Sequence, residues 1–281
     1  MASAPVLGCG PVVFTLEERA AEPVVWFDTA WTDPMHTGIP TLLRHESEVC
    51  FALEPGDELL TLIAIGMDTG RTLPSAMFTG ARRGIDLGGL GRTAEGFVFS
   101  GQGVGDQAAA THYLVDPLVG IHRGRSADPS HAVAADPSGR LYVAGGLDRI
   151  DVFDSFGSLG TSDTASVIHT DALYNSRLAV SPHLLVTAHT AAGFVEVGHV
   201  SQGTDMRQVY LEAFDSWVHG LSVFDNGTLR VLDDGPQGGA HATSRISTFD
   251  LETGQLLTEV WVDGRDELAR GLWCEPVGST P

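Results

Sequence analysis

Short runs in which apolar and polar residues alternate, separated by Gly, Pro, Asp and Asn, follow one another along most of the chain. Residues 131–157, HAVAADPSGRLYVAGGLDRIDVFDSFG, divide into three such runs, of which the second is Leu141–Ala144 and the third is Ile150–Asp154. Alternation with a period of two is typical of strands that bury one face, and Gly, Pro and Asp favour the turns between them. The pattern therefore predicts an all-β fold of short antiparallel strands.

The first run of this unit recurs along the chain as a variable residue, an alternating apolar segment and, in most copies, a Gly eight places on. The steps between successive copies are 35, 48, 45, 43 and 51 residues. A period near this length with several strands per unit is typical of β-propeller blades. We expect one six-bladed β-propeller domain over residues 1–281, built from four-stranded antiparallel blades. The copies begin at Glu48, Arg83, His131, Ser176, His219 and Arg270.

The two ends of the chain predict how the ring closes. After Arg270 one strand remains, Gly271–Val277. Candidates for the three strands that would complete its blade are Pro11–Thr15, Pro23–Asp28 and Ile39–His45. A sheet made of one carboxy-terminal strand and amino-terminal strands would leave no free edge in the ring.

The charge of the chain limits its partners. The formal net charge is −20, and all 16 basic residues are Arg. A strongly acidic surface repels nucleic acids and anionic membranes, so we expect neither as a partner. The lack of lysine excludes a Schiff-base lysine and favours a GC-rich source genome such as that of an actinobacterium.

The amino terminus and the cysteines predict a cytoplasmic protein. The first residues lack the basic and apolar regions of a signal peptide, and no apolar run reaches the ~18 residues needed to span a membrane. Cys9, Cys50 and Cys274 show no paired spacing. We therefore expect free, buried thiols in a reducing cytosol.

Several segments resemble known propeller repeats. Residues 131–157 resemble an NHL-type repeat, while LGCGPVV at 7–13 and YNSRLAVSP at 174–182 resemble motifs of the SMP-30/gluconolactonase/LRE-like family. That family consists of six-bladed propellers that bind a divalent metal through a Glu, an Asn and an Asp. Here Cys9 and His219 stand at the Glu and Asp positions, and Asn175 lies one residue out of register. These residues do not supply a carboxylate cage, so we expect no cofactor, with a divalent metal as the alternative.

The topology of a propeller indicates which residues surround the channel. The innermost strands all start at one face, so the first residues of the six copies should form a ring at the channel mouth. Loops between second and third strands should reach the same face with His189 and His241, and a loop between blades should bring Asn175 there. The ring residues are Glu48, Arg83, His131, Ser176, His219 and Arg270.

This ring predicts acid/base chemistry. His219 and His131 are the candidate catalytic groups, because imidazole titrates near neutral pH. Arg83 and Arg270 are candidates for binding a carboxylate or enolate oxygen. The alternatives are histidines that hydrogen-bond the backbone, arginines paired with acidic side chains, and a metal held by imidazoles from separate blades. The other candidate substrate-binding residues are Glu48, Ser176, Asn175, His189 and His241.

Three functions follow from these observations. The leading hypothesis is an enzyme of bacterial specialised (natural-product) metabolism, a lyase, cyclase or isomerase acting on an anionic or enolisable small molecule. The second, which the family resemblance implies, is a metal-dependent lactonase or related hydrolase. The third is a non-catalytic binding or scaffold propeller, because propellers serve many functions.

Overall fold

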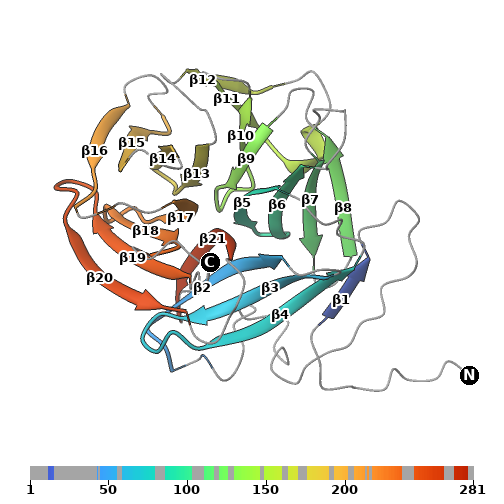
Figure 1. Ribbon diagram of the computed structural model, residues 1–281. Coiled ribbons are helices and arrows are strands. Elements are labelled where there is room, and N and C mark those ends of the chain that lie inside the picture. Colours follow the sequence, from blue (N-terminus) through green and yellow to red (C-terminus); the bar gives the residue numbers. More distant parts are fainter. Residues whose placement is uncertain are drawn as a thin grey trace, which may run out of the picture.

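The described strands form five sheets that surround a central axis (Figure 1). This computed structural model has the all-β architecture and antiparallel blades that the alternation predicts, but five blades within the part of the chain it describes instead of six. The described residues are 12–15, 43, 45–55, 59–79, 86–102, 111–116, 120–125, 130–145, 149–159, 164–169, 176–189, 193–201, 206–212, 214, 217–235, 244–262 and 269–277.

Four of the sheets are blades of four consecutive strands, numbered from the axis outward. The first consists of β5 (Asp86–Thr93), β6 (Gly96–Gln102), β7 (Thr111–Asp116) and β8 (Gly120–Arg125). The second consists of β9 (Ser130–Ala135), β10 (Leu141–Gly145), β11 (Arg149–Phe153) and β12 (Ser166–His169). The third consists of β13 (Ser176–Val180), β14 (Leu184–His189), β15 (Phe194–His199) and β16 (Arg207–Tyr210). The fourth consists of β17 (Val218–Val223), β18 (Thr228–Asp233), β19 (Arg245–Asp250) and β20 (Leu256–Trp261).

The fifth sheet is the closing blade, and it explains the wrong blade count. Its order is β21-β2-β3-β4-β1, with β21 (Arg270–Pro276) at the axis and β2 (Glu48–Pro55) antiparallel to it. The sequence pattern assigned β2 and β21 to the axis of two different blades, whereas the two strands are neighbours in one. The remaining strands of this sheet are β3 (Leu59–Gly66), β4 (Thr72–Thr79) and β1 (Val12–Thr15).

The ring closes in the predicted manner but with other strands. The carboxy-terminal strand does complete a sheet of amino-terminal strands, namely β2, β3 and β4. Of the three strands predicted before residue 45, Val12–Thr15 pairs in parallel with the outer edge of this sheet. Residues 23–28 lie outside the described part, and Leu43 and His45, the described residues of 39–45, are not in a strand.

The five innermost strands run in the same direction. Gly220 of β17 lies against Gly271 of β21, and Gly271 lies against Gly89 of β5. A Cβ atom on Gly220 would come within 2.5 Å of the Gly271 carbonyl carbon, so these strands approach too closely for a side chain. Further along both strands, the N–H of Cys274 donates to Ser222 Oγ at 3.0 Å, so β17 and β21 run side by side in the same direction. The strands therefore begin at one end of the channel, called here the mouth, and end at the other, called the base.

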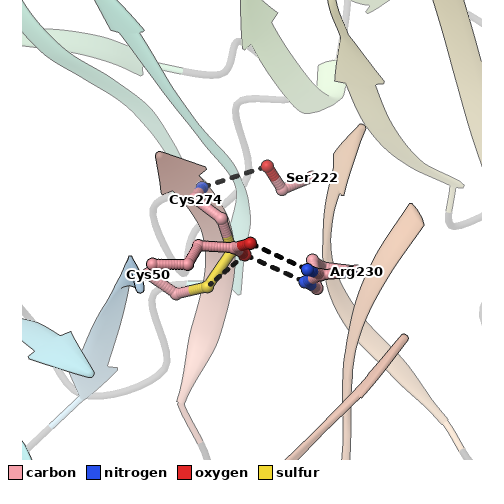
Figure 2. Close-up of a disulfide and its surroundings, with 5 residues drawn as sticks. Cys50, Ser222, Arg230 and Cys274 are labelled. Atoms are coloured by element: carbon pink, nitrogen blue, oxygen red, sulfur yellow. Dashed lines mark hydrogen bonds and ion pairs between the residues drawn. A yellow bond between two sulfur atoms is a disulfide. The ribbon is translucent and has the colours of Figure 1, made fainter. Parts of the chain in front are cut away.

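The sulfurs of Cys50 and Cys274 form a disulfide across β2 and β21, between residues 224 positions apart (Figure 2). The prediction of free thiols at these two positions is wrong. Antiparallel strands place directly opposite residues close enough for a cross-strand bond, and Cys50 and Cys274 are opposite each other in the register. The chain thus closes its ring with a covalent bond as well as with backbone hydrogen bonds.

Two ion pairs hold the closing blade to the blades on both sides at the base. Arg230 of β18 forms a bidentate pair with Glu48, at 2.9 and 2.7 Å (Figure 2). Arg92 of β5 pairs with Glu275 of β21, at 2.6 and 2.5 Å. Burial raises the pKa of Glu275, and the nearby Arg92 opposes that effect. At the base, therefore, each of these guanidiniums is matched by a carboxylate.

Apolar side chains fill the spaces between blades. One cluster joins Val186 and Val195 of the third blade to Val231 and Phe249 of the fourth, and all four are buried. Small and branched residues suit this packing because blades stack face to face with little space between them.

No helix among the described residues is long and apolar enough to cross a membrane.

Candidate functional site

The central channel is apolar toward the base and polar at the mouth. Toward the base, residues from all five innermost strands line a gap of about 180 Å³ that has no point wide enough for a water molecule. Water therefore has no room within this part of the channel. The residues that line the gap are Leu90, Ala134, Ala135, Ala179, Val180, Leu221, Ser222 and Trp273.

Irregular pairing at the mouth directs side chains toward the axis. The register between the first two strands shifts near the start of β5, β9, β17 and β21, whereas β13 pairs regularly with β14. In β17 the shift lies between Val218 and Gly220, so His219 has no partner on β18. In β21 it lies beside Gly271, whose φ of 64° is in the left-handed region that favours glycine. Such bulges re-aim side chains, here those of His219 and Arg270.

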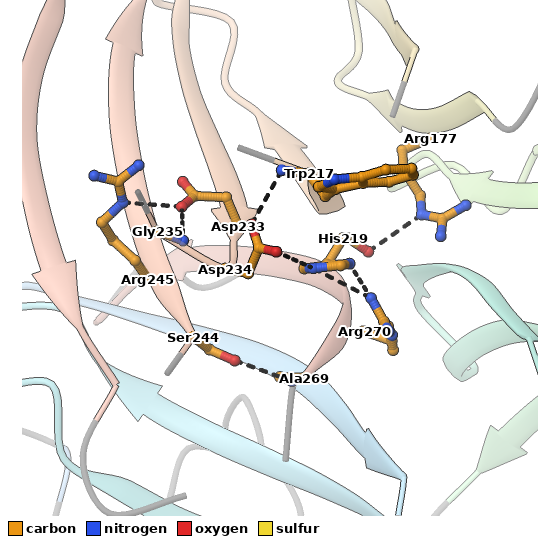
Figure 3. A network of polar contacts seen from close by, with 10 residues as sticks. All are labelled: Arg177, Trp217, His219, Asp233, Asp234, Gly235, Ser244, Arg245, Ala269 and Arg270. Carbon is orange, nitrogen blue, oxygen red and sulfur yellow. Dashed lines mark hydrogen bonds and ion pairs between the residues drawn. The ribbon is translucent and has the colours of Figure 1, made fainter. Parts of the chain in front are cut away.

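His219 and Arg270 are in contact at the mouth (Figure 3). The guanidinium Nη1 of Arg270 lies against Nδ1 of the imidazole. Nη1 also lies 3.3 Å from Nε2, but its contact with Nδ1 is the closer one. Because arginine is only a donor, we assign Nδ1 as the acceptor and the imidazole proton to Nε2. The N–H of Ala269 donates to Ser244 Oγ at 3.0 Å and fixes the start of β21. The pair is therefore set by two strands that are far apart in sequence.

Arg177, the second residue of β13, joins this pair from the third blade. Its Nε donates to the backbone carbonyl oxygen of His219 at 3.3 Å (Figure 3). The side chain is largely buried, with 7% of the residue exposed. Three neighbouring innermost strands therefore bring two guanidiniums and one imidazole together.

Among the residues that the structure describes, Asp234 brings a carboxylate to the mouth. Its Oδ2 lies 4.0 Å from His219 Nε2, longer than a hydrogen bond, and its Oδ1 accepts the backbone N–H of Trp217 at 3.0 Å (Figure 3). The side chains of Asp234 and His219 are only 12% and 8% exposed. Imidazole and carboxylate are thus close enough for one small substrate atom to contact both.

A buried network behind the mouth fixes the position of Asp234. The neighbouring Asp233 is fully buried, and its carboxylate accepts hydrogen bonds from the Gly235 N–H, Arg245 Nε and Ser247 Oγ at 2.7 to 2.9 Å. Burial raises the pKa of Asp233, and the hydrogen bond and charge of Arg245 act against that rise. A buried carboxylate with three donors is costly to move, so the backbone on either side of Asp234 is held in place.

The imidazole of His219 is uncharged near neutral pH. Burial, followed by repulsion from Arg270 and Arg177, lowers the pKa of His219 from 6.5 to about 3. Protonation would bury a third positive charge beside two guanidiniums. His219 is therefore a neutral hydrogen-bond donor through Nε2 and accepts through Nδ1.

The structure places two predicted mouth residues, His219 and Arg270, side by side. Glu48 was predicted there as well, but that prediction is wrong. Glu48 pairs with Pro276 at the end of β21, so it lies at the base and forms the ion pair with Arg230. The physical reason is that β2 is a second strand and runs opposite to the innermost ones.

Three further predicted residues are placed by their backbone only. His131 is the second residue of β9, Ser176 is the first of β13, and His189 is the last of β14. Ser176 and His189 are partners in the register, which agrees with the predicted approach of that loop to the mouth. Arg83, Asn175 and His241 lie outside the described residues.

Arg177, Asp234 and Trp217 were missed by the reasoning from sequence. Arg177 directly follows the predicted Ser176. Asp234 begins the loop between β18 and β19, which belongs to the class of loop that the topology placed at the mouth, and Trp217 precedes β17 in a connection between blades. Only Arg177 is one residue from a predicted position; Trp217 lies two residues before His219, and Asp234 lies seven before His241.

The residues present do not fit the divalent metal that the family resemblance implies. Cys9 and Asn175 lie outside the described part, and His219 has one guanidinium against its Nδ1 and a second nearby. Two neighbouring guanidiniums repel a divalent ion more strongly than a proton, because Coulomb repulsion grows with the charge of the ion. Among the described residues, Glu48, Cys50 and Cys274 also cluster, but the sulfurs are bonded to each other and Glu48 is paired with Arg230. We therefore derive no chemical step through a metal.

Comparisons with known proteins support the fold alone. No protein-family model matches the chain, and no curated protein matches it. A protein of unknown function from Bacteroides caccae has a similar structure, with a TM-score of 0.51 and 10% identity over 82% of this chain and 99% of that one. A structure of the nidogen/laminin complex aligns with a TM-score of 0.46 and 10% identity over 81% of this chain and 84% of that one. Glutaminyl cyclase from Myxococcus xanthus aligns with a TM-score of 0.41 and 13% identity over 63% and 70%.

Proposed function

We propose that this propeller is a small-molecule enzyme that moves a proton on an anionic, enolisable substrate at the mouth, as a lyase, cyclase or isomerase does. The observation that carries the proposal is the placement of the His219 imidazole between the guanidinium of Arg270 and the carboxylate of Asp234. Burial and the two guanidiniums lower the pKa of His219, which favours the neutral imidazole. A donor that stabilises an oxyanion beside a carboxylate base is the pairing that enolisation requires.

In the proposed reaction each group has a different role. Asp234 accepts the proton from the carbon next to a substrate carbonyl, and the electron pair of the broken C–H bond moves toward the carbonyl oxygen. His219 donates from Nε2 to that oxygen as negative charge develops, and Arg270 and Arg177 supply positive charge nearby. Return of the proton to another carbon gives an isomer, and loss of a leaving group gives an elimination product. The sequence assigned proton transfer to His219 itself, but a pKa of about 3 makes His219 a weak base and a suitable neutral donor.

Proton exchange with deuterated water tests this proposal without knowledge of the natural substrate. The probes are pyruvate and phenylpyruvate, 2-oxo acids whose C3 protons exchange when the molecule enolises, followed by proton NMR. We expect the protein to accelerate exchange and Asp234→Asn to slow it at least about tenfold, because general-base catalysis contributes ~10²–10⁴-fold. His219→Gln should also slow it, whereas His199→Ala, a change at an exposed histidine at the end of β15, should not. Equal exchange by the protein and Asp234→Asn would overturn the proposal.

A non-catalytic binding propeller is the second candidate. It is favoured by the same lowered pKa of His219, because a neutral imidazole held by Arg270 can simply bind an anion. Saturable binding of both probes without accelerated exchange would select this function. The metal-dependent lactonase has no comparable support, since the charges around His219 oppose a divalent ion.

The place where the protein works remains a prediction. Disulfides are rare in reducing cytosol and persist in oxidising compartments, so the Cys50–Cys274 bond weighs against the predicted cytoplasmic location. We propose an oxidising compartment. Alkylation of the protein in freshly opened source cells, followed by mass spectrometry, tests the proposed compartment. Unmodified Cys50 and Cys274 would support an oxidising compartment, and alkylation of both thiols would support the cytosol instead.

A further inference from the structure

Trp217 is an exposed aromatic residue at the mouth, and its place separates it from the other exposed apolar side chains. Among the described residues five large hydrophobic side chains are exposed, and four of them lie on the outermost strands β12, β16 and β20. Trp217, 57% exposed, instead directly precedes the innermost strand β17. Within this group Trp217 is thus the one that adjoins an innermost strand, whereas Trp261, at the end of β20, packs over Arg245 and beside Gly235.

The backbone of Trp217 is tied to the proposed catalytic groups. Its N–H donates to Asp234 Oδ1 at 3.0 Å, and His219 follows two residues later. Figure 3 shows the indole on the side of the mouth where Arg177 lies. Neither exposure nor this hydrogen bond alone identifies a ligand, but the combination places a large flat surface beside two guanidiniums and a neutral imidazole.

We propose that the substrate is a ring-bearing organic acid, with its acidic and carbonyl oxygens at Arg177, Arg270 and His219 and a planar ring stacked on Trp217. This inference rests on the proposed function and adds the class of substrate. An indole offers a large apolar face that gains most by covering a second ring, and ring stacking contributes beyond the area it buries. Arginine binds carboxylates bidentately, so one end of the ligand is fixed by charge and the other by the ring.

Two probes of equal charge isolate the contribution of the ring. Pyruvate and phenylpyruvate share the 2-oxo acid group, and only phenylpyruvate carries a ring. Isothermal titration should give phenylpyruvate an affinity at least about tenfold higher than pyruvate. Trp217→Ala should remove that preference and leave pyruvate binding within about twofold of the unchanged protein, while Trp217→Phe should keep most of the preference. Tyr210→Ala removes an exposed aromatic side chain of the outer strand β16 and serves as the matched control, which should change neither affinity.

The outcomes separate this inference from the function on which it rests. If both probes bind with equal affinity and both exchange protons, the proposed function holds and the ring-bearing substrate is wrong. If Trp217→Ala weakens pyruvate and phenylpyruvate by the same factor, Trp217 only supports the mouth and the inference is again wrong. If neither probe binds to the unchanged protein at millimolar concentration, both proposals fail together. Thermal unfolding of each variant shows whether the change has disturbed the fold.

Discussion

The mouth and the base of the channel use the same residue types for different purposes. At the base, Arg230 faces Glu48 and Arg92 faces Glu275, with two short contacts in each pair. At the mouth, two guanidiniums lie beside an imidazole whose Nε2 is 4.0 Å from Oδ2 of Asp234. The charged pairs at the base join neighbouring blades, whereas the guanidiniums at the mouth help to keep the imidazole of His219 uncharged.

One ring of strands thus carries stabilising contacts at one end and the candidate reactive groups at the other. The base also carries the disulfide and the strand that closes the ring, so the constraints gather at the end away from the candidate site. Strain and unusual protonation at functional sites are tolerated where the surrounding structure holds them in place.

Removal of β21 should abolish folding. A chain that ends at Val262 loses the innermost strand of the closing blade, including the buried Leu272 and Cys274. Each large buried side chain contributes about 1.5–3 kcal/mol, against a total of only ~5–15 kcal/mol for a domain. Thermal unfolding followed by circular dichroism should show no cooperative transition. A chain ending at Val277 keeps β21 and is the control, and a cooperative transition in the shorter chain would mean that the ring does not depend on this strand.

Loss of the disulfide should weaken the base and spare the mouth. Replacement of Cys50 and Cys274 together by Ala should lower the free energy of unfolding by about 2–5 kcal/mol, because the bond restricts the unfolded chain over a long loop. Urea unfolding measures the loss, and Cys9→Ala serves as the control. Below the unfolding transition, the affinity for pyruvate should stay within about twofold. An unchanged free energy of unfolding would show that the two sulfurs are not bonded in solution.

A carboxylate at the base should matter more for stability than one at the mouth. Glu48→Gln removes one charge of the bidentate pair with Arg230 and should cost about 2–3 kcal/mol. Asp234→Asn keeps an Oδ1 that accepts the Trp217 N–H, so it should cost less than about 1 kcal/mol. Urea unfolding of both variants makes the comparison. A reversed order would mean that the stabilising charges lie at the mouth.

The lowered pKa of His219 should make the protein less stable in acid. The unfolded imidazole titrates near 6.5 and the folded one near 3, so between these values only the unfolded chain gains the proton. The stability due to neutral His219 is therefore complete above pH 6.5 and lost as the pH falls toward 3. Burial also lowers the pKa of His112 to about 4, so that residue acts in the same direction. Between pH 7 and pH 4.5 the free energy of unfolding should fall by about 1–3 kcal/mol more in the unchanged protein than in His219→Asn. If the unchanged protein and His219→Asn lost the same free energy of unfolding, the acid sensitivity would arise from groups other than His219.

Much of the architecture can be read from local patterns. The alternation from Leu141 to Asp154 predicted two strands that the structure confirms as β10 and β11. The repeated unit predicted where β9, β13, β17 and β21 begin to within one residue. Such predictions succeed because strand geometry repeats every two residues and each blade must solve the same packing problem.

The number of blades depended on a pairing between distant segments. The sequence carried one signal for it: the step from Glu48 to Arg83 is 35 residues, shorter than the others by about one strand. A short step is expected when counting starts from a second strand instead of an innermost one. Nothing local to β2 indicates that its neighbour is β21, more than 200 residues away.

For the candidate site, too, local sequence predicted some features and the pairing of distant strands decided the others. The sequence by itself determined that His219 and Arg270 begin innermost strands, because the repeated unit marks those positions in each blade. Only the tertiary structure decided that these two side chains touch, that Glu48 lies at the opposite end, and that Cys50 bonds to Cys274. The physical reason is that closure of the ring sets which strands become neighbours, and that choice depends on the fit of the whole ring and not on any single segment.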